Sequence, residues 1–304
     1  MNTPSNNIPL TEKINPHAMG IDEKSTIEIL NIINDEDKIV ASAVEKEIPN
    51  IAKAVKTIVK TLKREGRVIY VGAGSSGRIG VLDAVELPVT FGIENRKVRA
   101  ILAGGNQAMF KAVEMAEDGR KKGYKALIKE GITMEDVVIG LSASGRTPFV
   151  LGALERANEI GAKSIIISSN SSAKAKNLAQ IFITPKVGPE IIAGSTRLKS
   201  ATAQKLILNM ISTASMIKLG KVYGPYMVDL STHNTKLIDR ATRMIAEVGG
   251  IDQKEAECLF NKAKGNVKAA ILMAKTKKGF MEVKALLDKA NAVLRDAIKY
   301  SEMT

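Results

Sequence analysis

Two short segments of the sequence combine serine, glycine and arginine in the pattern of a phosphate-binding turn. Residues 68–78 read VIYVGAGSSGR and residues 137–146 read VVIGLSASGR, so an apolar run is twice followed by small residues ending in Ser-Gly-Arg. The backbone amides of such a turn and of a following helix can hold a phosphate, and serine hydroxyls add donors. The repeated pattern predicts that both turns bind one phosphorylated small molecule, such as a phosphosugar.

The candidate phosphate ligands are hydroxyls, glycines and one arginine of these two turns. They are Ser75, Ser76, Gly77, Ser142, Ser144, Gly145, Arg146 and Thr147. Arg146 would supply a positive charge, whereas Arg78 in the first turn could instead be structural. A tight turn needs glycine but does not need so many hydroxyls, which favours phosphate binding over a purely structural role.

A dinucleotide is the alternative ligand for the first turn. Gly72, Gly74 and Gly77 have the spacing of a dinucleotide-binding turn, and Glu94 falls about where a ribose-binding carboxylate would lie. The glycine spacing alone is weak, and a dinucleotide does not explain a second serine-rich turn. A nicotinamide-dependent oxidoreductase is therefore the less favoured hypothesis.

The elements that must position these turns alternate between β-rich and helical segments. Strands are expected at residues 67–72, 98–104, 136–142, 164–168 and 180–185, and helices at 77–87, 106–119 and 147–161. This alternation is typical of an α/β fold in which helices cover both faces of a parallel sheet. Both turns then follow the carboxyl ends of strands, where ligands of such sheets bind.

The sequence as a whole predicts three parts. Residues 1–20 are polar and contain three prolines, so they are expected to form an N-terminal arm. Residues 21–240 would form the α/β domain, in which a long helix from about residue 198 to residue 219 follows the last strand. Residues 241–304 lack strand signals, so a small all-helical C-terminal domain is expected there.

The amino-acid composition favours some classes of binding partner and argues against others. The chain has 304 residues and a formal net charge of +13, which favours anionic ligands. It has no Trp, 4% aromatic residues and no long basic run, which argues against nucleic acid. No apolar stretch is long enough to predict a membrane span, and no secretory signal core is evident. A single cysteine, Cys258, suits a reducing compartment, so a cytoplasmic location is expected.

Four separated segments resemble the N-acetylmuramic acid 6-phosphate etherase family of the sugar isomerase (SIS) superfamily. They are GAGSSGRIGVLDAVELPVTFG, AGGNQAMFKAVEMAEDG, GLSASGRTPFVLGAL and GPEIIAGSTRLKSATAQKLILNM, and the resemblance extends over nearly the whole chain. It implies a SIS-type sandwich of a parallel sheet between helices and a homodimer. The helical C-terminal segment resembles small modules of the ubiquitin-associated type, although nothing in it indicates ubiquitin as a ligand.

The resemblance also implies a reaction. The family cleaves the ether between D-lactate and C3 of N-acetylmuramate 6-phosphate, giving N-acetylglucosamine 6-phosphate, in cell-wall amino-sugar recycling or catabolism. By motif position Glu86 resembles the proton donor and Glu117 the second catalytic residue, the base. The apolar neighbours of Glu86 predict burial of its carboxyl. Glu114 is a rival of Glu117 on the same expected helix, and only the motif match separates them.

The GSTRLK segment supplies further candidates for the substrate site. Ser195, Thr196, Arg197 and Lys199 could receive the lactate carboxylate or other sugar groups, and Glu190 could contact sugar hydroxyls. The alternative makes this segment the capped start of a buried helix.

No cofactor or metal is expected for this reaction. His17 and His233 are the only histidines, too isolated for a metal site, although His233 could assist ring opening. A non-catalytic sugar-phosphate sensor is the alternative function. The presence of both Glu86 and Glu117 favours the enzyme, because a sensor needs no acid and base.

Overall fold

The computed structural model describes residues 8–170, 173–232 and 235–303. The chain divides into two compact units. The first unit comprises Met1–Val85 and Asn95–Thr213, and the second comprises Glu86–Glu94 and Ala214–Thr304. Two helices, Gly74–Phe91 and Lys199–Lys218, contribute residues to both units.

The first unit is built on a five-stranded sheet whose pairs are all parallel. Its strands are β1 (Val68–Gly72), β2 (Val98–Leu102), β3 (Val137–Leu141), β4 (Lys163–Ile167) and β5 (Ile181–Ile183), in the order β2-β1-β3-β4-β5. The five predicted strands and the α/β fold class are confirmed. Strands β1 and β3 are buried at every residue, as expected for central strands covered on both faces.

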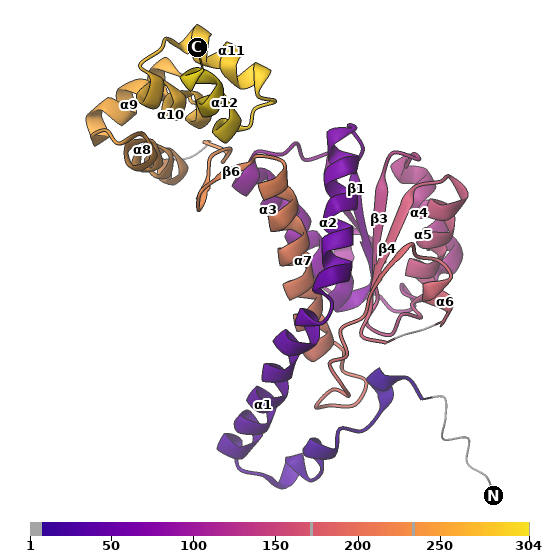
Figure 1. Ribbon diagram of the computed structural model, residues 1–304. Helices are drawn as coiled ribbons and strands as arrows, with labels where there is room; N and C mark the ends of the chain where they lie inside the picture. The colour runs from indigo at the N-terminus through magenta and orange to yellow at the C-terminus, as the bar shows by residue number, and fades with distance from the viewer. Residues whose placement is uncertain (1–7, 171–172, 233–234, 304) are drawn as a thin grey trace, which may run out of the picture. The chain divides into compact units, whose positions relative to one another are not determined.

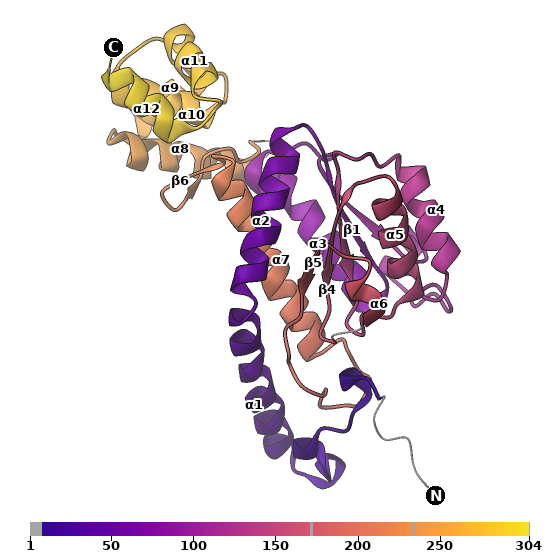
Figure 2. The ribbon, with the colours of Figure 1, turned by 45° about the vertical axis from the view of Figure 1, so that its right-hand side comes forward.

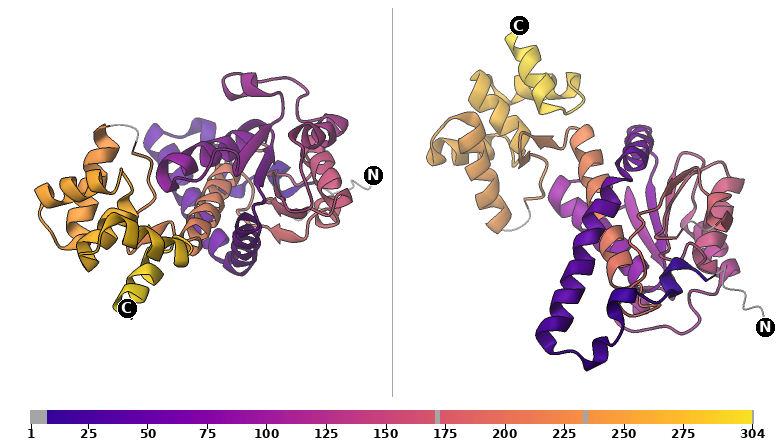
Figure 3. Two further views of the ribbon diagram at one scale, coloured as in Figure 1. Left: turned by 90° about the horizontal axis from the view of Figure 1, so that it is seen from above. Right: turned by 60° about the horizontal axis from the view of Figure 1, so that its bottom comes forward.

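Helices form a layer on each side of this sheet. The helices around it are α1 (Thr26–Glu45), α2 (Ile48–Lys63), α3 (Gly74–Phe91), α4 (Arg120–Glu130), α5 (Pro148–Glu159), α6 (Ala173–Lys176) and α7 (Lys199–Lys218). Helix α1 continues from α2 and extends beyond the sheet (Figures 1 and 2). Figures 1 and 2 show α2, α3 and α7 on one side of the strands and α4 with α5 on the other, and Figure 3 (left) shows the sheet between them. Apolar side chains of α5, such as Val150 and Leu154, pack against β1 and β3.

The carboxyl ends of the strands are level with one another. Gly72 at the end of β1 pairs with Leu102 of β2 on one side and with Leu141 of β3 on the other. Leu141 in turn pairs with Ile167, the last residue of β4. The chain leaves β1 first toward β2 and later returns to β3 on the opposite side, so the edge between β1 and β3 is the topological switch point where ligands bind in open α/β sheets.

The helix expected at residues 106–119 does not form. A short 3-10 helix, η4 (Asn106–Met109), is followed by turns up to Gly119, and Met115 has a positive φ of 53°. The apolar residues that gave the segment its helical spacing have no core to pack against, since Phe110 is 93% exposed and Met115 is 77% exposed. Helical spacing of apolar residues predicts a stable helix only where those residues can pack against another element.

Residues near the N-terminus pack more closely than a free arm would. From residue 8, where the described chain begins, to residue 25 there are three 3-10 helices, η1 (Leu10–Glu12), η2 (Pro16–Ala18) and η3 (Ile21–Glu23). Thr11 and Asn15 are buried, the Asn15 side chain donates to the Pro189 carbonyl, and the Thr11 carbonyl accepts from the Gly194 amide. The described part of the arm is therefore anchored to the segment that precedes α7.

The second unit is mainly helical. It contains α8 (Thr235–Gly249), α9 (Gln253–Lys262), α10 (Val267–Thr276), α11 (Phe280–Lys289) and α12 (Leu294–Glu302), preceded by a short antiparallel pair, β6 (Val222–Tyr223) and β7 (Tyr226–Met227). The sequence predicted an all-helical segment from residue 241, whereas α8 begins earlier, and it did not predict the hairpin, whose strands are two residues each. Helix α10 is buried along most of its length and forms the centre of the core. Over the described ranges, every helix is too short or too polar to span a bilayer.

An ion pair connects the starting ends of β1 and β3. The Arg67 side chain donates to both Asp136 carboxylate oxygens, at 2.7 and 3.3 Å, and the Arg67 amide donates to Asp136 at 2.8 Å. Burial alone would raise the pKa of Asp136. Hydrogen bonds from Arg67 and from the Thr133 amide outweigh burial, so the pKa of this carboxyl lies below its ordinary value.

Replacing Asp136 with Asn should destabilise the protein by about 2–4 kcal/mol at neutral pH, because the partly buried Arg67 loses the nearer of its two carboxylate partners, the other being Glu130 at 3.8 Å. A carboxyl with a lowered pKa in the folded state stabilises above its unfolded pKa, about 4, and this contribution is lost as the pH falls through the folded pKa. Urea unfolding of both proteins at pH 7 and near pH 3 should show the difference shrinking in acid. The exposed Asp35→Asn variant is the control, and a pH-independent difference would contradict this role.

Candidate functional site

The first predicted turn is the beginning of helix α3. Ser75 and Ser76 lie in its first turn, directly after β1, and both are partly exposed. The glycines have a packing role, because a Cβ at Gly77 would lie 2.7 Å from the Gly72 carbonyl oxygen. Helix and strand thus meet backbone to backbone, and the two serines lie at the carboxyl edge of the sheet.

The second predicted turn leads from β3 into α5. The Ser142 and Thr147 hydroxyls lie 2.7 Å apart in a hydrogen bond that spans the turn, and the Thr147 amide donates to Ser142 Oγ at 3.4 Å. Ser144 Oγ accepts from the Arg146 amide, and Gly145 takes a positive φ of 66°. Ser142 is buried, Ser144 and Thr147 are partly exposed and the Arg146 side chain is exposed, so the turn is a preformed arrangement of hydroxyls and amides.

A third group of hydroxyls at this edge is absent from the sequence-based candidates. Ser168 directly follows β4, and its hydroxyl donates to the Ala143 carbonyl at 3.2 Å. The Asn170 side chain donates to the Ser144 carbonyl at 3.3 Å. These contacts hold the second turn from the side of β4. The signal in the sequence was Ser-Ser-Asn at residues 168–170, immediately after an apolar run.

Sheet register brings the two serine-rich turns to neighbouring positions. Because Gly72 pairs with Leu141, Ala73 and Ser142 are the first residues beyond two adjacent strands. Arg78 donates to the Ala108 carbonyl at 2.9 Å and to the Lys111 carbonyl at 3.3 Å. These bonds give Arg78 the structural role that was the alternative for it.

Glu117 lies in the irregular segment before α4, and its side chain is exposed. Its backbone carbonyl accepts from the Phe149 amide at 2.9 Å, in the first turn of α5 and two residues after Thr147. This bond brings Glu117 beside the second turn. Glu114 is also exposed. Among the described residues, no backbone hydrogen bond connects Glu114 with the second turn.

Glu86 lies on α3 and is exposed in the chain, so the burial expected from its apolar neighbours is not observed. The apolar residues on the same side, Leu82, Val85 and Val89, are themselves 44–56% exposed. Hydrophobic neighbours in sequence bury a carboxyl only when another element covers them. The catalytic role of Glu86 remains a prediction.

The GSTRLK segment is the start of α7, and Glu190 caps it. Glu190 is fully buried, and its two carboxylate oxygens accept from the Lys199 and Ser200 amides, each at 2.9 Å. A negative charge at this position also suits the positive end of the helix dipole. Ser195 and Thr196 are partly exposed and Arg197 is exposed, so these three remain accessible to a ligand.

Lys199 is buried and forms an ion pair with the buried Glu36 of α1. Glu36 also accepts from the Asn15 side chain at 2.8 Å and contacts His17 Nδ1 at 2.6 Å. Burial would raise the pKa of Glu36, but hydrogen bonds from Lys199, His17 and Asn15 hold it below its ordinary value. The chain therefore uses Lys199 and His17 to join α1 and the arm to the start of α7.

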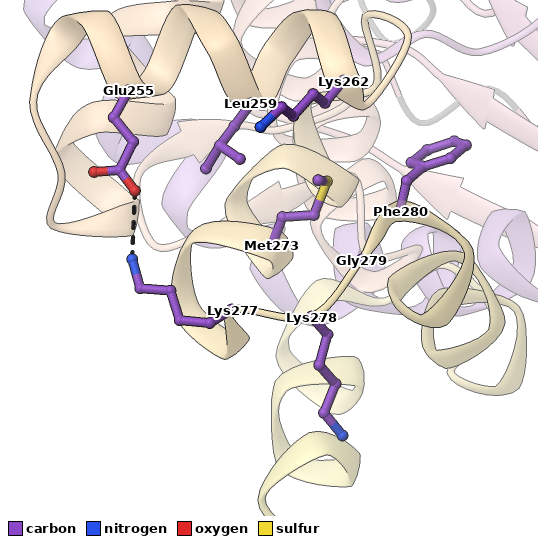
Figure 4. A pocket seen from close by; sticks show the side chains of 8 residues that line it. All are labelled: Glu255, Leu259, Lys262, Met273, Lys277, Lys278, Gly279 and Phe280. Carbon is purple, nitrogen blue, oxygen red and sulfur yellow. Dashed lines mark hydrogen bonds and ion pairs between the residues drawn. The ribbon is translucent and has the colours of Figure 1, made fainter.

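The predicted site residues belong neither to a metal site nor to the pocket of the second unit, within the described residues. Among the residues the structure describes, no three His, Cys, Asp or Glu side chains gather as metal ligands would, and His233 lies outside the described residues. Figure 4 shows a pocket of the second unit, with an apolar floor and lysines at its rim, where Lys277 pairs with Glu255 at 3.4 Å. None of the predicted site residues lines it.

The Glu190→Gln variant tests whether Glu190 caps helix α7 or contacts a ligand. We expect the free protein to lose about 1–2 kcal/mol of stability, because an amide can replace only one of the two acceptors and removes the charge at the helix start. Thermal unfolding without ligand measures this loss, with the exposed Glu114→Gln as control. An unaltered melting temperature together with weaker phosphosugar binding would show that Glu190 serves the ligand instead.

Two family models of SIS domains match the chain. Residues 50–158 match the family model of the glucokinase regulatory protein N-terminal SIS domain, and residues 108–214 match that of the SIS domain. A protein of Bacteroides fragilis NCTC 9343 described as a phosphosugar isomerase involved in capsule formation superposes with a TM-score of 0.50 at 19% identity, covering 68% of this chain and 98% of that one. This likeness shows the fold alone.

Similarity to curated proteins extends over nearly the entire chain. The N-acetylmuramic acid 6-phosphate etherase of Clostridium beijerinckii is 49% identical over 95% of this chain and 95% of its own length. That of Caldanaerobacter subterraneus subsp. tengcongensis is 49% identical over 97% of this chain and 96% of its own. The chain therefore belongs to the N-acetylmuramic acid 6-phosphate etherase family and contains its SIS domain.

Proposed function

We propose that this protein is a carbon–oxygen lyase that cleaves the D-lactyl ether of N-acetylmuramate 6-phosphate and releases N-acetylglucosamine 6-phosphate and D-lactate. The observation that carries the proposal is the pair of serine-rich turns at level, adjacent strand ends, with the Glu117 backbone bonded to the start of α5 beside the second turn. Membership of the etherase family supports the choice of substrate.

The phosphate is the group that the two turns would hold. Ser75 and Ser76 offer hydroxyls at the start of α3, and Ser144 and Thr147 offer them at the start of α5. Both helix starts add partial positive charge, which suits a phosphate dianion. Arg146, exposed at the second turn, would add a full positive charge.

The proposed reaction is an elimination followed by addition of water. In the open-chain sugar the C1 aldehyde acidifies the C2 proton, which the Glu117 carboxylate removes. Electrons of the C2–H bond form a C2–C3 double bond as the C3–oxygen bond breaks, and Glu86 gives a proton to the departing lactate oxygen. Water then adds hydroxyl at C3 and a proton at C2, which restores the sugar skeleton and uses no redox cofactor.

Glu86→Gln and Glu117→Gln should each reduce lactate release from N-acetylmuramate 6-phosphate by about 10²–10⁴-fold, the usual contribution of a positioned acid or base. Exchange of the C2 proton with deuterated solvent should be lost in Glu117→Gln and retained in Glu86→Gln. The matched control is Glu114→Gln, which should keep nearly full activity. Tight phosphosugar binding without turnover by the unaltered protein would favour a sensor instead.

We also propose that the protein works as a homodimer in the cytoplasm. Helix α1 carries Ile27 and Leu30, which are 65% and 55% exposed in the single chain, and a second copy of the chain would cover them. The free thiol of Cys258 is exposed, which suits a reducing compartment.

The double substitution Ile27→Asp with Leu30→Asp should shift sedimentation equilibrium from a dimer toward a monomer, because buried charges disfavour an apolar interface. The single substitution of the exposed Asp35→Asn, farther along the same helix and off the side of Leu30, is the control and should leave the mass unaltered. A monomeric unaltered protein would refute the dimer.

A further inference from the structure

Buried polar atoms without hydrogen-bond partners are concentrated in a few places. Within the described residues they are Arg156 Nε, Ser169 Oγ, Thr184 Oγ1, Ser200 Oγ, Gln204 Nε2, Gln204 Oε1 and Ser215 Oγ. Gln204 stands out among them because it is 1% exposed and both its amide nitrogen and its amide oxygen lack a partner. Buried polar groups are nearly always satisfied in proteins, so each exception calls for water or a ligand.

Several of these atoms belong to the carboxyl edge of the sheet. Thr184 directly follows β5, and Ser169 is the second residue after β4, whose last residue pairs with the last residue of β5. Ser200 lies in the first turn of α7, and Gln204 lies one turn later on the same side of that helix. Unsatisfied hydrogen-bonding capacity thus accompanies the two serine-rich turns at this edge.

Gln204 of α7 and Ser75 of α3 are equally far in sequence from a contact between the two helices. Ser212 of α7 donates to the Asp83 carboxylate of α3 at 2.9 Å, and Figures 1 and 2 show the two helices side by side. Ser75 precedes Asp83 by eight residues, and Gln204 precedes Ser212 by eight residues. Eight residues of α-helix rise about 12 Å. Counted from this hydrogen bond, Gln204 and Ser75 therefore lie equally far toward the starts of their helices.

The position of this part of α7 is well defined. Glu190 accepts from the first two amides of the helix, and Lys199 is held by Glu36. Gln204 is therefore carried by a fixed backbone, while the three rotatable bonds of its own side chain let the amide reach a ligand.

We infer that Gln204 is a specificity-determining residue that binds the acetamido group at C2 of the phosphosugar, an inference that rests on the proposed function. A carboxamide side chain offers one acceptor and two donors. An acetamido group offers one N–H and one carbonyl, so the two amides can satisfy each other. A sugar with a free amine at C2 has no carbonyl to offer, and its positive charge has no counter-charge in the Gln204 amide.

The experiment compares N-acetylglucosamine 6-phosphate with glucosamine 6-phosphate, using calorimetry on the full-length protein and on Gln204→Met. Unaltered protein should bind the acetylated sugar at least about tenfold more tightly, as expected for one or two hydrogen bonds. In Gln204→Met this preference should fall to about twofold or less, while affinity for glucosamine 6-phosphate stays nearly unaltered.

Stability of the unliganded protein gives a second readout. Gln204→Met should melt at the same temperature as the unaltered protein or higher, because an apolar side chain of similar length removes two unsatisfied polar atoms. A residue with a purely structural hydrogen bond would lower the melting temperature when replaced. If Gln204→Met does not fold, Gln204→Leu replaces it in both measurements.

The matched control is Ser215→Ala, which removes another buried, unpartnered polar group of α7, eleven residues farther along the helix. It should retain the preference for the acetylated sugar. Retention of that preference in Gln204→Met would overturn the inference. Absence of lactate release from N-acetylmuramate 6-phosphate by the unaltered protein would refute the proposed function instead, so the two failures are distinguishable.

Discussion

The parallel pairing of β1 with β3 is the constraint on which the candidate site depends. Its register places Gly72 opposite Leu141, so the residues that follow both strands emerge at the same height. A shift by one residue would move every side chain of a strand to the opposite face and would separate the two serine-rich turns. At the other end of these strands, the bonds between Arg67 and Asp136 fix the same register. The ion pair at one edge of the sheet thus helps to keep the two serine-rich turns aligned at the opposite edge.

Local patterns in the sequence predicted the sheet and the turns well. Each predicted strand is a short apolar run bounded by polar residues or glycine, and the two serine-rich turns directly follow two of these runs. These features depend on neighbouring residues, so one sequence contains them. The hydroxyl contacts of Ser168 with the second turn were missed because they connect two strands through a backbone carbonyl, which leaves no spacing rule in the chain.

Features that depend on distant partners were not predictable in this way. The segment at residues 106–119 has helical spacing but lacks a surface to cover its Phe110 side. Lys199 resembled an anion ligand, yet it pairs with Glu36, 163 residues earlier in the chain. Glu190 resembled a sugar contact and serves the amides of α7. In each case the identity of the residue was informative, but its partner was fixed by tertiary structure.

Glu190 also fixes the segment between β5 and α7 to the start of α7. This stretch has no regular secondary structure from Thr184 to Leu198, yet its middle is fastened to the helix that follows it and to Thr11 and Asn15 near the N-terminus. Because hydrogen bonds hold this segment at several residues, it does not order or unfold independently of its neighbours. Its ordering, the first turn of α7 and the docking of the arm should consequently occur as one cooperative event, so that loosening any of the three frees the others.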